Sequence, residues 1–72
     1  MKKEVLDLFK KGNSTTSLRN YKLAIDYYTR AIKIEPNFVE AYKNRGFAKK
    51  LLGDEKGYKS DLRKANKIEK ES

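Results

Sequence analysis

The sequence predicts an all-α fold in which two helix-turn-helix hairpins stack on one another. Three observations carry this prediction. Apolar residues recur at steps of three and four, no stretch alternates as a β-strand would, and the sequence repeats itself with a period of 34 residues. The chain has 72 residues. It therefore has room for one small domain, which buries only about 60 % of the surface of its unfolded form.

The first two predicted helices form the first hairpin. The first covers about residues 3–17, and its apolar side consists of Val5, Leu8, Phe9 and Gly12. Asn20 is a favourable N-cap for the second helix, because its side chain can accept a hydrogen bond from a free backbone N–H. Pro36 prevents that helix from continuing beyond Glu35. These punctuating residues delimit two helices joined by a tight turn.

The third and fourth predicted helices form the second hairpin. We expect Asn37 to start the third helix, with Glu40 three residues later completing a near capping box. Gly53 is a typical helix stop, and Asp54 is an N-cap for a fourth helix that runs to about residue 70. The sequence therefore predicts four helices in all.

The second half of the chain repeats the first. Residues 5–38 align with residues 39–72 with eight identities, at Val5/Val39, Gly12/Gly46, Leu18/Leu52, Lys22/Lys56, Ala31/Ala65, Lys33/Lys67, Ile34/Ile68 and Glu35/Glu69. A single hairpin of this size cannot bury its own apolar face. We therefore expect the two hairpins to stack and share one core.

The period and the order of these residues resemble the tetratricopeptide repeat (TPR) family. The matching positions are Gly12, Ala24, Tyr28, Ala31 and Pro36 in the first copy, and Tyr42, Gly46, Leu62 and Ala65 in the second. The resemblance covers essentially the whole chain. It implies a TPR-like fragment of an α-solenoid that binds other proteins as a scaffold.

Some residues depart from the family pattern. Lys11 and Thr15 replace apolar family residues, so we expect the first helix to make few core contacts. Tyr58 replaces a small alanine, so the sequence does not predict whether the two helices of the second hairpin cross closely. Five apolar residues of the second helix become polar or glycine in the last helix, at Glu55, Gly57, Lys59, Asp61 and Asn66. We interpret the helix 54–70 as a polar C-terminal cap whose outer side is exposed to solvent. The alternative is a degenerate internal repeat.

The composition excludes most chemistry. The chain has no Cys and no His, which rules out disulfides and thiol or imidazole mechanisms and speaks against zinc. Carboxylates such as those of Asp26 and Glu35 have a simpler interpretation as helix-capping and solvated groups. We therefore predict no enzymatic activity, no cofactor and no metal. Neither a signal peptide nor a transmembrane segment is visible, so we expect a cytoplasmic protein, unless the chain was excised from a longer one.

The resemblance implies that the first helix of each hairpin lines a groove for a peptide or a partner helix. The candidate groove residues are Phe9, Asn13, Lys43, Asn44, Phe47 and Lys50, with Ser17 on the same stripe. Two phenylalanines beside cations and amides suit a peptide with acidic and apolar groups. The alternative is that both phenylalanines are buried between the hairpins.

One subgroup of the family clamps the C-terminal carboxylates of heat-shock chaperones with Lys and Asn residues. Asn13 and Asn44 match its two Asn positions, but Phe9 stands at the first Lys position. The subgroup's further cations lie on a fifth helix, beyond the four predicted here. We therefore expect carboxylate binding to be weak.

The net charge of +8 offers a rival interpretation. A basic stripe on the last helix could meet phosphates, anionic lipid headgroups or an acidic protein, and consists of Lys56, Lys59, Arg63, Lys64 and Lys67. A solvated face is the simpler interpretation. Nucleic acid is not a favoured partner, because Tyr58 is the one aromatic residue near the stripe.

A third interpretation is self-association. The second helix is apolar on most of its circumference, at Tyr21, Leu23, Ile25, Tyr27, Tyr28, Ile32 and Ile34. Two hairpins cannot cover all of these side chains, and a core this small gains from a partner. A homodimer or an exchange of hairpins between chains would supply one.

Overall fold

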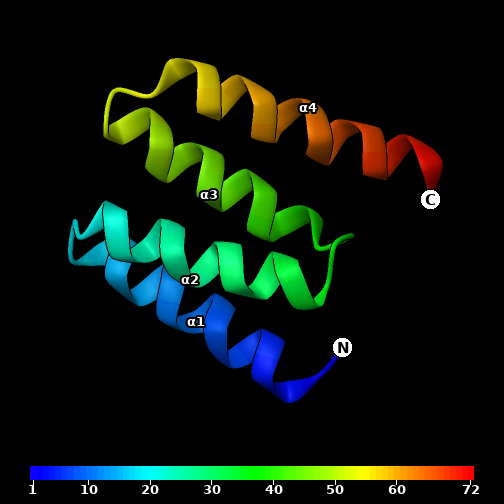
Figure 1. Cartoon of the computed structure of the whole chain (residues 1–72), viewed down its shortest axis with the longest axis horizontal. Helices are drawn as coiled ribbons and strands as arrows, with labels where there is room; N and C mark the ends of the chain where they lie inside the picture. Colours follow the sequence, from blue (N-terminus) through cyan, green and yellow to red (C-terminus); the bar gives the residue numbers. More distant parts are fainter.

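The computed structural model describes all 72 residues and contains four helices. They are α1 (Lys3–Ser17), α2 (Tyr21–Ile34), α3 (Val39–Leu51) and α4 (Glu55–Glu71). Neighbours in sequence lie side by side and run in opposite directions, so that both chain termini are at one end (Figure 1). The predicted all-α fold of two stacked hairpins is confirmed.

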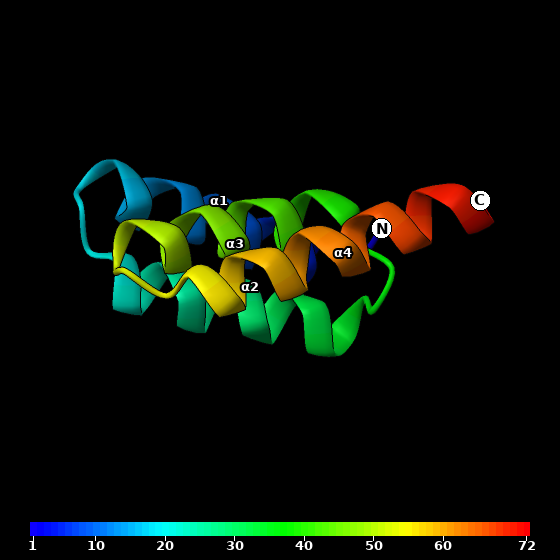
Figure 2. The ribbon, with the colours of Figure 1, turned by 90° about the horizontal axis from the view of Figure 1, so that it is seen from above.

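The molecule is a flat plate with extents of 32 × 29 × 15 Å. Seen along the plate, α1 and α3 lie on one side and α2 lies on the other (Figure 2). Neither the length nor the apolar content of any helix suffices to cross a membrane.

The turn between α1 and α2 ends one helix and starts the next within three residues. The N–H of Arg19 donates to Thr16 O at 2.9 Å, and the N–H of Asn20 donates to Thr15 O at 2.8 Å. These two bonds form a Schellman motif. The motif requires a left-handed residue, and Arg19 has this conformation with φ of 63°. Asn20 is also the N-cap of α2, where its Oδ1 faces the Leu23 N–H at 3.5 Å. The predicted Asn20 cap is confirmed.

The turn between α3 and α4 repeats this geometry 34 positions later. The N–H of Gly53 donates to Lys50 O at 2.9 Å, and the N–H of Asp54 donates to Lys49 O at 2.8 Å. Gly53 has φ of 90°, which glycine adopts without strain. Asp54 Oδ1 accepts from the Gly57 N–H at 2.8 Å, so the predicted Asp54 cap is also confirmed.

The predicted capping box at the start of α3 is wrong. The N-cap is Phe38 rather than Asn37, and no side chain caps this helix. The carbonyl oxygen of Phe38 accepts from the N–H groups of Ala41 and Tyr42 at 3.1 and 3.3 Å. The reason is packing: the Phe38 ring is buried in the core, and this fixes the start of α3 one residue later than the polar pattern predicts.

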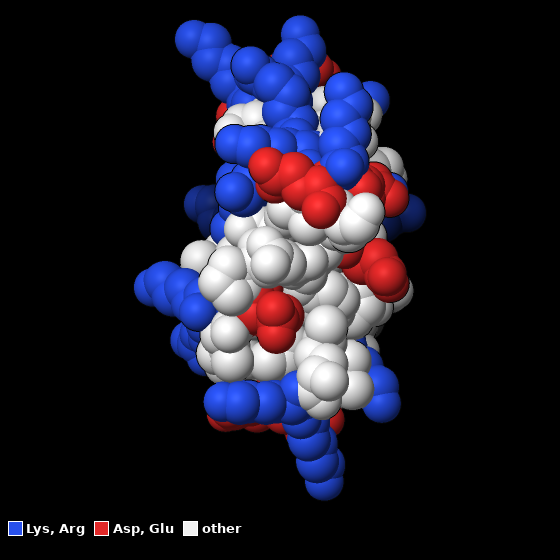
Figure 3. All heavy atoms as spheres, turned by 90° about the vertical axis from the view of Figure 1, so that its right-hand side faces the viewer, with Lys and Arg blue, Asp and Glu red and all other residues white.

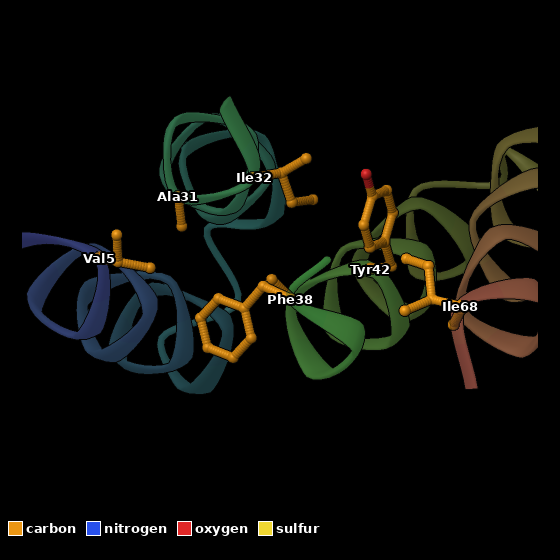
Figure 4. Close-up of a cluster of buried hydrophobic side chains, with 8 residues drawn as sticks. Val5, Ala31, Ile32, Phe38, Tyr42 and Ile68 are labelled. Carbon is orange, nitrogen blue, oxygen red and sulfur yellow. The ribbon is translucent and has the colours of Figure 1, made fainter. Parts of the chain in front are cut away.

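Both hairpins contribute to one hydrophobic core. Its buried members come from all four helices and the middle turn (Figure 4), and are Val5, Ala31, Ile32, Phe38, Ala41, Tyr42, Ala65 and Ile68. Phe38 lies between the first hairpin and α3, while Tyr42 and Ile68 face each other across the second hairpin (Figure 4). The stacked hairpins therefore share one core, as predicted.

Glycines at equivalent positions allow the close contacts within each hairpin. A Cβ on Gly12 would overlap the ring of Tyr28. A Cβ on Gly46 would lie 3.1 Å from the Cβ of Asp61 and 3.3 Å from the carbonyl oxygen of Tyr58. The second hairpin therefore crosses closely although Tyr58 replaces alanine, and the half-buried Tyr58 ring lies under the Lys50 ammonium, 4.9 Å from it.

Asp61 does not lie on a solvent-exposed outer side of the last helix, contrary to the sequence-based prediction. It is 3 % exposed. Arg45 donates to its carboxylate twice, at 2.9 and 2.7 Å, and the Lys49 ammonium lies 3.2 Å away. Helical phase explains the burial, because Asp61 precedes the buried Ala65 by four residues and Ile68 by seven, so all three share one side of α4.

Candidate functional site

A shallow hollow lies where α1 and α3 run beside each other. Its volume is about 260 Å³, and it is lined by Asn13, Thr16, Ser17, Tyr28, Asn44 and Phe47. Three of the six predicted groove residues therefore meet at one place, and the structure adds Thr16 and Tyr28 to them. We call this feature the α1–α3 hollow.

A chain of hydrogen bonds orients the two amides in the α1–α3 hollow. The phenol of Tyr28 donates to Asn13 Oδ1 at 2.6 Å, and Asn44 Nδ2 donates to the same oxygen at 3.0 Å. These two bonds use both lone pairs of Asn13 Oδ1. The Asn13 amide N–H groups and the Asn44 carbonyl oxygen are therefore left for a ligand.

Tyr28 is the anchor of this network. It is a buried residue whose oxygen also lies 3.2 Å from Thr16 Oγ1. Burial raises the pKa of the Tyr28 phenol above its ordinary value of 10.0, and the hydrogen bond with Thr16 offsets part of that rise. The phenol therefore stays protonated at neutral pH and remains a hydrogen-bond donor to Asn13.

The two phenylalanines of the predicted groove have different surroundings. The Phe9 ring packs against Phe38 and Tyr28, with ring centroids 4.8 and 5.8 Å apart. It is half-buried between the hairpins, as in the alternative interpretation, and does not line the α1–α3 hollow. Phe47 is 52 % exposed at the edge of the hollow.

The side chains of the two lysines of the predicted groove point towards α4 instead of the hollow. The Lys43 ammonium lies 3.2 Å from a carboxylate oxygen of Glu69. The Lys50 ammonium lies over the Tyr58 ring. Both lysines are exposed, but neither lines the hollow.

All five residues of the predicted basic stripe are exposed on α4. None of its five members, Lys56, Lys59, Arg63, Lys64 and Lys67, forms an ion pair. From the end of the plate where both termini lie, basic side chains gather over α4 at the top and near the start of α1 at the bottom, and the mostly white band between them holds some acidic side chains (Figure 3).

The apolar surface predicted to drive self-association is smaller than the sequence indicated. Tyr28 and Ile32 are buried in the monomer, so they offer nothing to a second chain. Leu23 and Ile34 remain exposed on α2, and Tyr27 between them is half-buried beneath the guanidinium of Arg30.

Sequence reasoning missed two features of these surfaces. It placed Tyr28 in a core role and did not foresee that its phenol orients the Asn13 amide. It also missed the buried pair of Asp61 with Arg45. A signal for the second was present, since the helical spacing from Asp61 to Ala65 and Ile68 puts a carboxylate on a buried stripe.

Comparison with known proteins relates the chain to a family of helical repeats. A family model described as TPR repeat matches residues 12–53, which is more than half of the chain. Tetratricopeptide repeat protein 36 of Danio rerio is 38 % identical to this chain over 63 residues. The match takes in 88 % of this chain and 34 % of that protein, so the chain spans about a third of the length of this relative.

Proposed function

Because the chain belongs to the TPR family, we propose that it is a protein-interaction module that binds an extended peptide or a partner helix against α1 and α3. TPR repeats generally mediate protein–protein interactions and are typically non-catalytic. The proposed contact site is the α1–α3 hollow, with Phe47 at its edge.

The oriented amide pair is the observation that carries this proposal. The hydrogen bonds from Tyr28 and Asn44 both end on Asn13 Oδ1. Asn13 therefore still offers its N–H donors to a ligand, and Asn44 offers its carbonyl oxygen as an acceptor. A peptide backbone presents one acceptor and one donor at every residue. The pair therefore complements a backbone amide, and its orientation is set before a ligand arrives, which lowers the entropic cost of binding.

The surroundings of the hollow favour a ligand with apolar and acidic groups. Phe47 provides an exposed aromatic ring for an apolar side chain. Lys43 and Lys50 flank it on α3 at distances of one helical turn, and the whole chain carries +8. No cation lines the hollow itself, which disfavours a clamp for a terminal carboxylate.

Selection from a random peptide library, followed by affinity measurement, tests the proposal. We expect the Phe47→Ala variant to bind the selected peptides at least about tenfold more weakly, because aromatic anchors carry much of an interface's energy. Asn13→Ala removes the donor and should also weaken binding. The matched control is Leu23→Ala, which truncates an exposed apolar side chain on α2, outside the hollow.

Circular dichroism is used to verify that each variant is folded. If both Phe47→Ala and Asn13→Ala bind as the unmodified chain does, the hollow is not the binding site. If Leu23→Ala alone weakens binding, the site is on α2.

A further inference from the structure

Two of the identities between the repeats lie outside the core. Leu18 and Leu52 are equivalent, and they are 78 % and 46 % exposed. Lys22 and Lys56 are also equivalent, and both are exposed. Substitutions at exposed positions usually change stability little. Folding alone therefore does not require a leucine and a lysine at these positions of both hairpins.

The four side chains lie at one edge of the plate. Leu18 is the C-cap of α1, and Lys22 is the second residue of α2. Leu52 and Lys56 have the same places on α3 and α4. The two turns that contain these residues are both at the end opposite to the chain termini (Figures 1 and 2). Leu51, which is 45 % exposed, is a third leucine at this end. We call this surface the turn edge, which consists of Leu18, Arg19, Lys22, Leu51, Leu52 and Lys56.

A neighbouring hairpin does not cover the turn edge. Leu18 is exposed although a hairpin is stacked after its own, and the equivalent Leu52 is exposed although a hairpin is stacked before its own. Leu51 and its counterpart Ser17 are likewise both exposed. Stacking on either side of a hairpin therefore leaves these positions open to solvent.

The turn edge is basic as well as apolar. Four exposed cations at this end form no ion pair, namely Arg19, Lys22, Lys50 and Lys56. They outnumber the exposed carboxylates of Asp54 and Glu55, and Asp54 already accepts a hydrogen bond from the Gly57 N–H. Exposed leucines bordered by cations match an anionic bilayer, where apolar side chains enter the acyl boundary and cations meet the headgroups.

We propose that the turn edge docks this protein on an anionic membrane surface. Leu18, Leu51 and Leu52 enter the boundary between headgroups and acyl chains, and the cations of the edge contact lipid phosphates. A protein partner is a poorer match, because leucine is under-represented among interface hot spots and lysine is depleted at protein–protein interfaces. The turn edge shares no residue with the lining of the α1–α3 hollow, so the two sites can be tested separately.

Co-sedimentation with lipid vesicles measures the docking. Vesicles of phosphatidylserine mixed with phosphatidylcholine present the anionic surface, and vesicles of phosphatidylcholine alone are the neutral control. We expect the chain to bind the anionic vesicles at least about tenfold more tightly, with affinity falling as the salt concentration rises. Equal binding to both kinds of vesicle overturns the proposal, and so does absence of binding to the anionic vesicles at low salt.

Two double variants separate docking through the leucines from attraction of the whole +8 chain. Leu18→Ser combined with Leu52→Ser should weaken binding at least about tenfold, because two leucines no longer leave water. Leu6→Ser combined with Ile34→Ser is the matched control, since these side chains are 40 % and 38 % exposed near the opposite end of the plate. Circular dichroism verifies that each variant is folded. Equal losses in the two variants overturn the proposal.

A second pair of variants tests the cations. Lys22→Gln combined with Lys56→Gln should weaken binding to anionic vesicles more than Lys2→Gln combined with Lys33→Gln. All four lysines are exposed, and both double variants remove the same charge. A larger loss in the second variant would place the lipid contact at the other end of the plate and overturn the proposal.

Fluorescence locates the contact directly, because the chain contains no tryptophan. Leu18→Trp should show a blue-shifted emission when anionic vesicles are added, since the indole ring enters a less polar environment. Ile34→Trp, at the opposite end of the plate, should show no such shift. Absence of a shift at position 18 overturns the proposal.

Sedimentation without vesicles tests a different occupant of the turn edge. A monomer at all concentrations supports the proposal. A dimer that is lost in the Leu18→Ser, Leu52→Ser variant would mean that a second copy covers the edge, and would overturn it. Asn13→Ala, in the α1–α3 hollow, should bind vesicles as the unmodified chain does. A loss in that variant would assign vesicle binding to the hollow instead.

Discussion

Replacing Asp61 by alanine should destabilise the fold far more than replacing any exposed aspartate. The Asp61 carboxylate accepts two hydrogen bonds from Arg45 and lies 3.2 Å from the Lys49 ammonium. Its side chain is 5 % exposed, whereas those of Arg45 and Lys49 are 16 % and 22 % exposed. The variant leaves two cations at a partly buried site without their counter-charge.

The expected cost follows from this geometry. Breaking a buried ion pair by removing one partner costs about 3–5 kcal/mol. The residual exposure of Arg45 and Lys49 lets water solvate part of their charge, so we expect a value near the lower end, about 3 kcal/mol. A domain of 72 residues has a free energy of unfolding of roughly 4–11 kcal/mol. The loss is therefore a large fraction of the total stability.

Asp26→Ala is the matched control. Asp26 pairs with Arg30 at 2.9 Å, but the two side chains are 49 % and 59 % exposed, so the pair contributes only about 0.5 kcal/mol. Both changes replace aspartate by alanine inside a helix, and the gain in helix propensity cancels between them.

Urea and thermal denaturation followed by circular dichroism measure the difference. We expect the Asp61 variant to melt roughly 10–20 °C below the Asp26 variant, at about 4–8 °C per kcal/mol for a domain of this size. Equal stabilities would refute the reasoning that the Asp61 pair is a buried charge contact.

Two further predictions concern Arg19 and Tyr28. Arg19→Gly should raise the free energy of unfolding by about 0.5–1 kcal/mol in urea denaturation. The reason is that Arg19 has φ of 63°, where the equivalent turn has Gly53. A loss of stability would instead indicate that the Arg19 guanidinium makes a contact of its own. Because the pKa of Tyr28 is raised in the folded state, its contribution to stability is complete below about pH 10 and is lost as the pH rises through the folded-state pKa. Denaturation across this range should show a smaller alkaline loss in Tyr28→Phe, and an equal loss would contradict the argument.

Much of the fold could be predicted because its signals are local. Asn20 and Asp54 act as N-caps through their own side chains, and Pro36 stops a helix through its own ring. The period of 34 residues then predicted that two equivalent hairpins share a core. The repeat also held an unused clue: Arg19 aligns with Gly53, so the left-handed conformation of one could have been inferred from the other.

The features that escaped prediction depend on how the helices pack. Asn37 has the right chemistry for a cap, but the burial of Phe38 decides where α3 starts. Phe9 and Phe47 are both aromatic residues on first helices, yet only Phe47 is at the hollow, because the Phe9 ring is held against Phe38. The direction of a long side chain such as Lys43 likewise depends on the neighbouring Glu69.

The three-residue turns within each hairpin have a consequence for the lengths that this fold tolerates. The backbone N–H of Asn20 and of Asp54 completes the C-terminal motif of one helix, and the side chain of the same residue caps the next helix. Every residue in either turn is therefore needed for the hydrogen bonds of the turn. One inserted residue would rotate everything after it by about 100°, taking the apolar side of the following helix away from its partner. Each turn thus acts as a rigid joint that sets the rotation of one helix relative to the other. Natural or engineered insertions should therefore be rejected at these two turns.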